Sequence, residues 1–198
     1  TILLNGKDIQ GLNTAQINRA GIARTFQNIR LFQNLSVEEN IITAMDTQMH
    51  YNMAEGILRL PRFWREERVV HERAMELLSI FHMEEFADVK AGSLPYGAQR
   101  RLEILRALAT NPCLLLLDEP AAGMNPSETA ELMENIRSIR DTFKIAVLLI
   151  EHDMNLVMNI CEGIAVLNFG RIIAKGSPDD IQNNPEVIEA YLGKKKEA

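Results

Sequence analysis

The sequence has little of what marks secreted, membrane-spanning or nucleic-acid-binding proteins. Its two cysteines, Cys113 and Cys161, lie far apart and lack the spacing of metal ligands. The longest apolar runs, 113–117 and 145–150, are far shorter than the roughly 20 residues of a membrane-spanning helix. The net charge is −6, and the only basic cluster is 194–196. These absences argue against a disulfide scaffold, a chain that crosses a bilayer by itself and a broad nucleic-acid surface, and they fit a reducing cytoplasm.

The length and the apolar content predict a compact domain. The chain has 198 residues, of which 46% are hydrophobic, enough for a sizeable core. It starts at Thr1, and residues 2–7 suit a strand that runs into a turn with nothing before it to pair with. We therefore expect a domain that is cut off at its N-terminus.

Hydrophobic periodicity predicts a mostly helical first half. Residues 12–20 have helical spacing, and residues 22–26 suit a short strand. Helical spacing then continues over residues 37–86, interrupted by an irregular stretch at 51–68. The first half thus contributes the strands at 2–7 and 22–26 and a group of helices.

The second half has the pattern of a parallel sheet. Apolar runs at 114–117 and 145–150 are joined by an amphipathic helix that Asn125 can cap. Strand, helix, strand in this order predicts parallel strands with a right-handed crossover. A hairpin at 164–174 and a helical region over 177–193 complete the expected α/β fold.

Acidic residues and a histidine follow both predicted parallel strands. Asp118 and Glu119 come after the first, and Glu151, His152 and Asp153 after the second. Because ligands bind beyond the carboxyl ends of parallel strands, we expect both runs to face one crevice. One carboxylate there can hold the water shell of Mg²⁺, another can orient an attacking water, and a histidine can contact a terminal phosphate. These groups are the parts of phosphoryl transfer to water.

A turn with a glycine precedes the first of these strands. Leu94, Pro95, Tyr96 and Gly97 break the chain before a helix predicted at 98–109. A glycine at a helix N-terminus exposes backbone N–H groups and can cradle an anion. Taken alone, such a turn is more often an ordinary helix start.

Five segments, taken together, carry a resemblance to a known family. Residues 94–104 (LPYGAQRRLEI) and 114–120 (LLLLDEP) resemble the signature and Walker B motifs of ATP-binding cassette (ABC) ATPases. Residues 24–27 (RTFQ) are similar to the Q-loop, 121–125 (AAGMN) to the D-loop and 150–153 (IEHD) to the switch-histidine segment. Their order and spacing are highly specific.

Within that family the chain is most similar to the ATPase subunits of branched-chain amino-acid importers. The similarity lies in residues 121–126, in the helical insertion around Phe63 and Trp64, and in the ending at 184–193. The resemblance implies transport of hydrophobic amino acids powered by ATP hydrolysis.

The resemblance also implies a fold and its subdivision. The fold is a P-loop NTPase-like α/β core with an inserted α-helical subdomain, within a single partial nucleotide-binding domain that lacks its N-terminal β and Walker A portion. Residues 1–27 form the rest of the N-terminal core up to the Q-loop, and 28–110 the helical subdomain with the signature helix. Residues 111–198 form the catalytic core with Walker B, D-loop and switch histidine.

The family's functional residues carry over onto matching positions, with ATP and Mg²⁺ as implied cofactors. Glu119 corresponds to the base that polarises the attacking water, and His152 to the histidine that contacts the γ-phosphate. Asp118 supports Mg²⁺, while Gln27 senses the γ-phosphate and metal and couples the site to the membrane partner.

Family members work in pairs, with each ATP between the phosphate loop of one subunit and the signature of the other. The implied partners are a second ATPase subunit, transmembrane permease subunits and, indirectly, a binding protein, but no nucleic acid. The subunit is expected at the cytoplasmic face of the membrane. The signature residues implied to act on the partner's nucleotide are Leu94, Pro95, Tyr96, Gly97, Ala98 and Gln99, and those of the D-loop are Gly123, Met124 and Asn125.

Three departures from the family pattern bear on activity. No G-x-x-x-x-G-K-[ST] motif is present, and the family's phosphate loop is expected to lie before Thr1. Pro95 stands where many relatives carry serine, and Ala98 where a polar residue is common. We therefore expect weakened signature recognition and poor or absent ATP binding by this chain as written.

Three other functions stay open at this point. A closely similar ATPase that exports lipopolysaccharide or another lipid shares the mechanism. Soluble ABC ATPases of DNA repair or translation usually carry long coiled-coil insertions or tandem domains, neither of which is present in this sequence. A truncated, non-catalytic remnant that binds a permease fits the missing loop, although Glu119 and His152 argue for an active parent.

Overall fold

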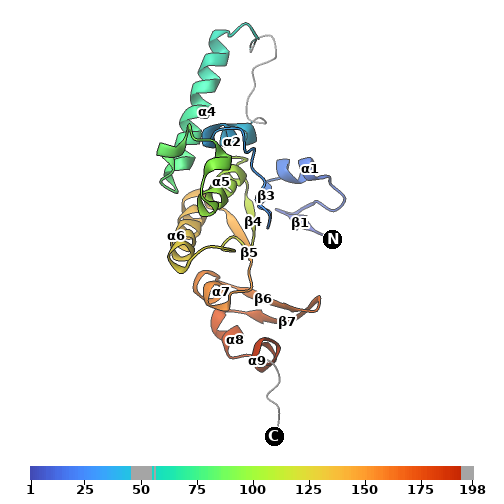
Figure 1. The fold of residues 1–198 in the computed structure, drawn as a ribbon. Helices are drawn as coiled ribbons and strands as arrows, with labels where there is room; N and C mark the ends of the chain where they lie inside the picture. The colour runs from blue at the N-terminus through green and yellow to red at the C-terminus, as the bar shows by residue number, and fades with distance from the viewer. Residues whose placement is uncertain (46–54, 56, 193–198) are drawn as a thin grey trace. The chain divides into compact units, whose positions relative to one another are not determined.

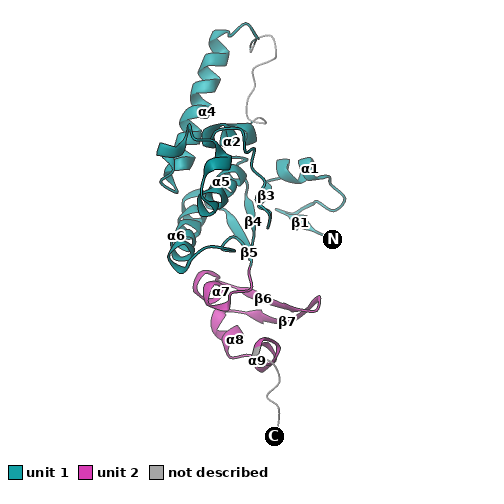
Figure 2. Cartoon of the chain, in the orientation of Figure 1, with its two compact units in different colours: residues 1–150 teal, residues 151–198 magenta. Residues whose placement is uncertain are grey.

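The computed structural model describes residues 1–45, 55 and 57–192 of the chain (Figure 1). The chain divides into two compact units, Thr1–Ile150 and Glu151–Ala198 (Figure 2). Each unit is described separately below. None of the described helices is long and apolar enough to span a bilayer.

The first unit is built on a parallel sheet of three strands in the order β3-β4-β5. These strands are β3 (Ile22–Arg24), β4 (Leu114–Asp118) and β5 (Ala146–Ile150). The central strand β4 is a run of leucines, of which Leu115 and Leu117 on one face are buried and Leu114 and Leu116 on the other are half-buried. The predicted parallel sheet is confirmed.

Helix α6 (Pro126–Phe143) is the crossover between β4 and β5. It begins at a capping box in which the Asn125 side chain accepts from the Glu128 N–H at 3.0 Å, and Glu128 accepts from the Asn125 N–H at 3.0 Å. Pro126 occupies the first turn, where its missing N–H costs nothing. The predicted start of this helix is therefore confirmed. Its buried side chains are Leu132, Met133, Ile136 and Ile139.

The helical part of the first unit consists of α2, α4 and α5, which contact one another (Figure 1). Their buried residues form a core that includes the fully enclosed Ile41, Leu78 and Ile104. This core accounts for the helical periodicity of the sequence. The bounds are α2 (Val37–Ala44), α4 (Pro61–Ser79), α5 (Tyr96–Leu108) and the short 3₁₀ helices η2 (Glu84–Phe86) and η3 (Ala91–Ser93).

Two predicted boundaries in this region are wrong. Helix α4 already begins at Pro61, so the stretch 61–68 is helical rather than irregular, because a proline in the first turn starts a helix instead of breaking it. Residues 51–54 and 56 of that predicted stretch lie outside the described part. Helix α5 begins at Tyr96 rather than Ala98, so Gly97 lies within its first turn.

The N-terminal segment forms a hairpin, in which the strand runs into a turn as predicted and pairs with residues that follow it. Strand β1 (Leu3–Leu4) pairs antiparallel with β2 (Lys7–Asp8). The turn consists of Asn5 and Gly6, with φ values of 48° and 77°. An Asn-Gly pair suits a two-residue turn that needs positive φ at both positions. Helix α1 (Thr14–Arg19) follows, and the side chain of its N-cap residue Asn13 accepts from the Gln16 N–H at 2.9 Å.

The second unit contains α7 (Met154–Ile160), the hairpin β6 (Ile164–Asn168) and β7 (Arg171–Gly176), and two helices at its end. The helices are α8 (Pro178–Gln182) and α9 (Pro185–Leu192). The predicted hairpin is confirmed. The small core of the second unit is formed by Ala174, Ile181 and Val187.

Candidate functional site

The carboxyl end of β4 places two acidic residues side by side. Asp118 is the last residue of the strand, and Glu119 continues the ladder because its N–H donates to the Ile150 carbonyl at 2.9 Å. Glu119 then adopts φ of 44°, in the left-handed region. For a residue with a Cβ this conformation costs about 1–2 kcal/mol, so the surrounding contacts must hold it in place.

The side chains of Gln27 and Glu119 meet at this end of the sheet. Gln27 Nε2 donates to Glu119 Oε2 at 3.1 Å, although 92 residues separate the two in the sequence. Gln27 follows β3, so the residues come from the ends of adjacent strands. An amide donor orients a carboxylate without taking its charge away. The structure thus brings together two of the predicted site residues.

Asp118 has a different partner. Its Oδ2 accepts from Arg24 Nη2 at 2.8 Å, and the side chains are 54% (Arg24) and 21% (Asp118) exposed. Exposure of the arginine limits the strength of this ion pair. The Asp118 N–H donates to the hydroxyl of the buried Thr25 at 3.3 Å, which ties the end of β4 to β3.

The first turn of α5 contains the predicted signature residues. Pro95 occupies the N-cap position and makes no side-chain hydrogen bond to the helix, so no capping side chain covers its first N–H groups. Tyr96 is 47% exposed, and Gly97 and Ala98 are half-buried. Gln99 Nε2 donates to the carbonyl of the buried Leu94 at 2.8 Å and so closes the turn before the helix.

The predicted D-loop packs against this turn. Gly123 has φ of 77°, and a Cβ added there would lie 3.2 Å from Tyr96 Cε1. A Cβ at Gly97 would lie 3.3 Å from Glu128 Oε1. The Met124 N–H donates to the Ala121 carbonyl at 3.1 Å. The start of the signature helix, the D-loop and the start of α6 are therefore in direct contact. Asn125, the last of the predicted D-loop residues, caps α6 as described above.

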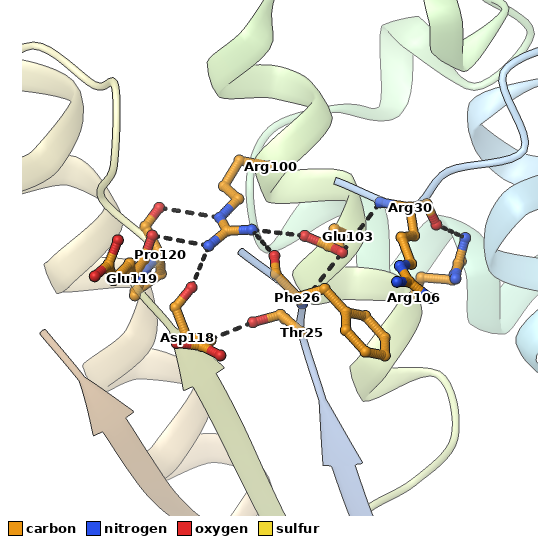
Figure 3. A network of polar contacts seen from close by, with 9 residues as sticks. All are labelled: Thr25, Phe26, Arg30, Arg100, Glu103, Arg106, Asp118, Glu119 and Pro120. Carbon is orange, nitrogen blue, oxygen red and sulfur yellow. Dashed lines mark hydrogen bonds and ion pairs between the residues drawn. The ribbon is translucent and has the colours of Figure 1, made fainter. Parts of the chain in front are cut away.

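One turn further along α5, a buried ion pair connects the motifs (Figure 3). Arg100 is 0% exposed and donates to Glu103 Oε2 at 2.9 Å. Its guanidinium also donates to the Glu119 carbonyl at 2.8 Å and to the Pro120 carbonyl at 3.3 Å. The backbone carbonyls that accept from it belong to Phe26, Asp118, Glu119 and Pro120.

Arg100 was not predicted to be a site residue, because a charged residue on an amphipathic helix usually lies on the solvent side. Arg100 is four residues before Ile104 and eight before Leu108, both of which are buried. Residues at that spacing share one face of a helix. The register against Ile104 and Leu108 was therefore the signal that could have placed Arg100 inside.

His152 and its neighbours belong to the second unit. The His152 carbonyl accepts a hydrogen bond from the Tyr191 hydroxyl, and its ring Nδ1 lies 3.9 Å from Glu151 Oε2. Asp153 caps α7, since its Oδ1 accepts from the Asn155 N–H at 2.9 Å. The predicted contact of His152 with a terminal phosphate, and the predicted common crevice, stay predictions.

Comparison with known families decides the assignment. The family described as "ABC transporter" matches residues 1–122, which is more than half of the chain. The chain belongs to the ABC transporter family. A second family, described as "Branched-chain amino acid ATP-binding cassette transporter", matches residues 171–197 of this ABC chain.

Similar proteins cover nearly the whole of this ABC chain. The high-affinity branched-chain amino acid transport ATP-binding protein BraF of Pseudomonas aeruginosa is 47% identical over 97% of this chain and 75% of its own length. LivG of Escherichia coli K12, described in the same words, is 47% identical over 98% of this chain and 76% of its own. The ADP conformation of MJ1267, an ATP-binding cassette of an ABC transporter, superimposes with a TM-score of 0.76 at 30% identity, covering 95% of this chain and 74% of that one.

Beside the Gln27 loop, the surface of this ABC chain is hollowed. The hollow, about 360 Å³ in volume, is lined in part by Phe26, Phe32, Glu103 and Arg106. The guanidinium of Arg106 lies 5.3 Å from the centre of the Phe32 ring, within the range of a cation–π contact. Burial lowers the pKa of Arg106 because it disfavours the charged form, and the nearby Glu103 carboxylate acts in the opposite direction.

The ABC family binds nucleotide, and the residues present suit a magnesium ion held with it. Among the described residues, no group of three or more His, Cys, Asp or Glu side chains could hold a metal alone. Mg²⁺ commonly needs only one or two carboxylates besides water and phosphate oxygens. Asp118 and Gln27 offer such hard oxygen ligands, but the Asp118 carboxylate is shared with Arg24. This donor set fits Mg²⁺ bound together with phosphates.

Proposed function

We propose that the chain is the ATP-hydrolysing portion of an importer subunit for branched-chain amino acids. The observation that carries this proposal is the Gln27–Glu119 hydrogen bond at the carboxyl end of β4. It places a carboxylate and an amide from two adjacent strands where ligands bind in such sheets. The family membership and the printed names of BraF and LivG support the amino-acid substrate.

Each site residue has a distinct task in this proposal. Glu119 polarises the water that attacks the γ-phosphate, and Gln27 orients the Glu119 carboxylate through its amide N–H. Asp118 holds Mg²⁺ through its water shell, and Mg²⁺ neutralises charge on the phosphates when bound. His152 contacts the γ-phosphate. The domain division proposed from the motifs, 1–27, 28–110 and 111–198, assigns these tasks to its first and third parts.

The signature turn is proposed to act on a nucleotide held by a second ATPase subunit. Its support is the start of α5, where Pro95 provides no side-chain cap and Tyr96 is exposed. Uncapped N–H groups at a helix start attract phosphate oxygens. Because the backbone N–H of Ala98 is independent of its side chain, the loss of a polar side chain there weakens recognition without removing it.

Transmembrane permease subunits are the proposed membrane partners, with a binding protein acting indirectly. The hollow beside the Gln27 loop supports this proposal, because Phe26 and Phe32 are 39% and 50% exposed at its rim. Aromatic side chains of this kind are typical of contact surfaces. Such a partner would hold the subunit at the cytoplasmic face of the membrane.

The 198 residues by themselves are proposed not to hold MgATP tightly. No G-x-x-x-x-G-K-[ST] motif lies among them, and the backbone N–H groups and lysine of that motif supply the main phosphate contacts. Without those contacts, the acidic residues Asp118 and Glu119 would face the phosphates with too little positive charge.

Calorimetry of MgATP binding tests this reading. The comparison is between the 198-residue chain and a version extended upstream to carry a phosphate loop, here called the extended version. We expect the extended version to bind at least about 100-fold more tightly, equivalent to about 2.7 kcal/mol. An extended version with its loop lysine replaced by alanine is the matched control. Tight binding by the 198-residue chain would show a nucleotide site built from other residues.

Uptake measurements test the transported substrate. The extended version, assembled with its permease subunits and binding protein in vesicles, should accumulate labelled leucine in an ATP-dependent manner. Vesicles that carry Glu119→Gln should not accumulate it. ATP hydrolysis stimulated by a lipid instead of an amino acid would contradict the importer assignment.

A further inference from the structure

Arg100 is buried in a way that the proposed catalytic roles leave unexplained. Among the described residues, the buried polar side chains are those of Thr25, Asn40, Arg100 and Glu103. Arg100 has the largest side chain of the four. Burial of a guanidinium is costly unless every part of it is hydrogen-bonded. The contacts made by Arg100 therefore indicate what its burial achieves.

Those contacts converge on the two strands that carry the proposed catalytic pair. Arg100 Nη2 donates to the carbonyl of Glu119 itself at 2.8 Å. Arg100 Nη1 donates to the carbonyl of Phe26, the residue directly before Gln27. One planar guanidinium thus holds the backbone carbonyls of Glu119 and Phe26 (Figure 3). These carbonyls lie in the two segments whose side chains form the Gln27–Glu119 hydrogen bond.

Glu103 holds the same loop from its other side. Its Oε1 accepts from the N–H of Phe26 at 3.4 Å and from the N–H of Arg30 at 3.3 Å. Its Oε2 accepts from Arg100. Both backbone polar groups of Phe26 are therefore bound by the Arg100–Glu103 pair, which leaves the loop little freedom at the residue preceding Gln27.

The turn at Glu119 needs such support because its backbone is strained. Glu119 has φ of 44°, a conformation that residues with a Cβ adopt reluctantly. The Arg100 donors reach the carbonyls of Asp118, Glu119 and Pro120, which bracket that conformation on both sides. Without them each of these three carbonyls would lose a donor, and the turn would be held less firmly.

We propose that Arg100 is a positioning residue for hydrolysis, which acts from the signature helix by fixing the backbone of Glu119 and of the loop that bears Gln27. The inference rests on the proposed function of Glu119 as the base. Stability alone does not require this residue, because a buried ion pair is often replaced by apolar side chains of similar volume without loss. An array of carbonyls on two chain segments, in contrast, requires the forked donors of arginine.

Amide hydrogen exchange in the 198-residue chain, without nucleotide, tests the hold on the backbone. The variant is Arg100→Lys, which keeps a positive charge beside Glu103 but has no planar fork. We expect at least about 10-fold faster exchange at the N–H groups of Arg30 and Ala122, the latter of which donates to the Glu119 carbonyl. The matched control is Arg101→Gln, on the solvent side of the same helix, which should leave both amides unchanged. Equal exchange in the two variants would overturn the proposal.

Hydrolysis by the extended version tests the catalytic consequence. Arg100→Lys should lower kcat by about 100-fold while KM changes less than about 2-fold, because nucleotide contacts stay in place. Combined with Gln27→Ala, the loss should be clearly smaller than the product of the two single losses, since both act on the position of Glu119. A change in KM alone, or fully multiplicative losses, would refute a positioning role.

The outcomes also separate this inference from the proposed function. If the unsubstituted extended version fails to hydrolyse MgATP, the proposed function is wrong and the positioning role is wrong with it. If it hydrolyses MgATP and Arg100→Lys matches it in kcat, only the positioning role is wrong. Should Arg100→Lys unfold, the apolar pair Arg100→Met with Glu103→Leu replaces it, with the same expected loss of kcat, measured at a temperature at which circular dichroism shows that variant to be folded.

Discussion

Two successive turns of helix α5 differ sharply in what they contact. The first turn, from Tyr96 to Ala98, is partly exposed, and no side chain of Pro95 caps it. The second turn contains Arg100, which is 0% exposed and bound to the carbonyls at the end of β4. Two successive turns of one helix therefore have different surroundings, since the first is partly exposed and the side chain of Arg100 in the second is buried against backbone carbonyls. The difference shows that residues of a single motif can lie on two surfaces of the protein. The contacts of the buried surface cannot be predicted from the motif sequence alone.

The largest expected effect is that of replacing Glu119, whose backbone carbonyl accepts a hydrogen bond from Arg100 in the second turn of α5. Glu119→Gln in the extended version should reduce MgATP turnover by at least about 1,000-fold, because the amide cannot polarise water as a carboxylate does. MgATP affinity should stay within about 3-fold, since Arg100 still holds the backbone. The measurement is single-turnover hydrolysis beside calorimetry, with Glu131→Gln on the exposed face of α6 as the control. Unchanged turnover would remove Glu119 as the base.

The second prediction compares the stability contributed by the two sides of α5. Leu105→Ala should lower the free energy of unfolding by about 2–5 kcal/mol, because Leu105 is 0% exposed and its truncation leaves a cavity. Tyr96→Ala, in the 47% exposed first turn, should cost less than about 1 kcal/mol. Urea unfolding followed by circular dichroism measures both. Similar losses of unfolding free energy in the two variants would mean that the buried and the exposed parts of α5 contribute equally to stability.

A third prediction concerns the contact that the first turn does make. Gly123→Ala should cost about 1–2 kcal/mol, because φ is 77° and the new Cβ would lie 3.2 Å from Tyr96 Cε1. Gly170→Ala is the matched control, since Gly170 has the same φ of 77° but a Cβ there meets nothing within 4 Å. Thermal unfolding of both variants decides. A cost at Gly170 equal to that at Gly123 would mean that the segment at Gly123 does not press on Tyr96.

The smallest effect is expected at the neighbour of Arg100. Arg101 Nη1 lies 2.8 Å from Glu131 Oε1, and the side chains are 24% and 51% exposed. Arg101→Gln should therefore cost only about 0.2–1 kcal/mol, and less at high salt. Urea unfolding at two ionic strengths measures it. A loss comparable to that of Leu105→Ala would contradict the placement of Arg101 at the surface beside the buried Arg100.

The sequence predicted the parts of the fold that depend on local pattern. The leucine run before Asp118 and the Asn125 cap have a direct physical reading, and both the parallel strand and the helix start are confirmed. The N-terminal strand and the turn after it were predicted, but the pairing of β1 with β2 across Asn5 and Gly6 was not, although an Asn-Gly turn is a local hairpin signal. Helix α4 was placed too late because Pro61 was read as a breaker instead of a first-turn residue.

The candidate site likewise has residues that could be predicted from the sequence and one, Arg100, that could not. Gln27 was singled out by its resemblance to the Q-loop and Glu119 by its place after a predicted strand, and their hydrogen bond agrees with the rule that ligand-binding residues gather at the carboxyl ends of parallel strands. The role of Arg100 did not follow, because it depends on which of two adjacent arginines faces inward. That choice is set by the tertiary register of α5 against β4 and the Gln27 loop, which no local pattern of charges specifies. The tasks of His152 and of the signature residues stay predictions.

The Arg100–Glu103 pair also has a consequence for how this protein can change over evolutionary time. Losing either member alone leaves the other as an uncompensated buried charge, which typically costs about 3–5 kcal/mol, a large part of a domain's whole stability. A lineage can therefore leave this arrangement only by substituting both residues at nearly the same time. Across a set of descendants the two positions should vary together or not at all, while Arg101 drifts freely beside them.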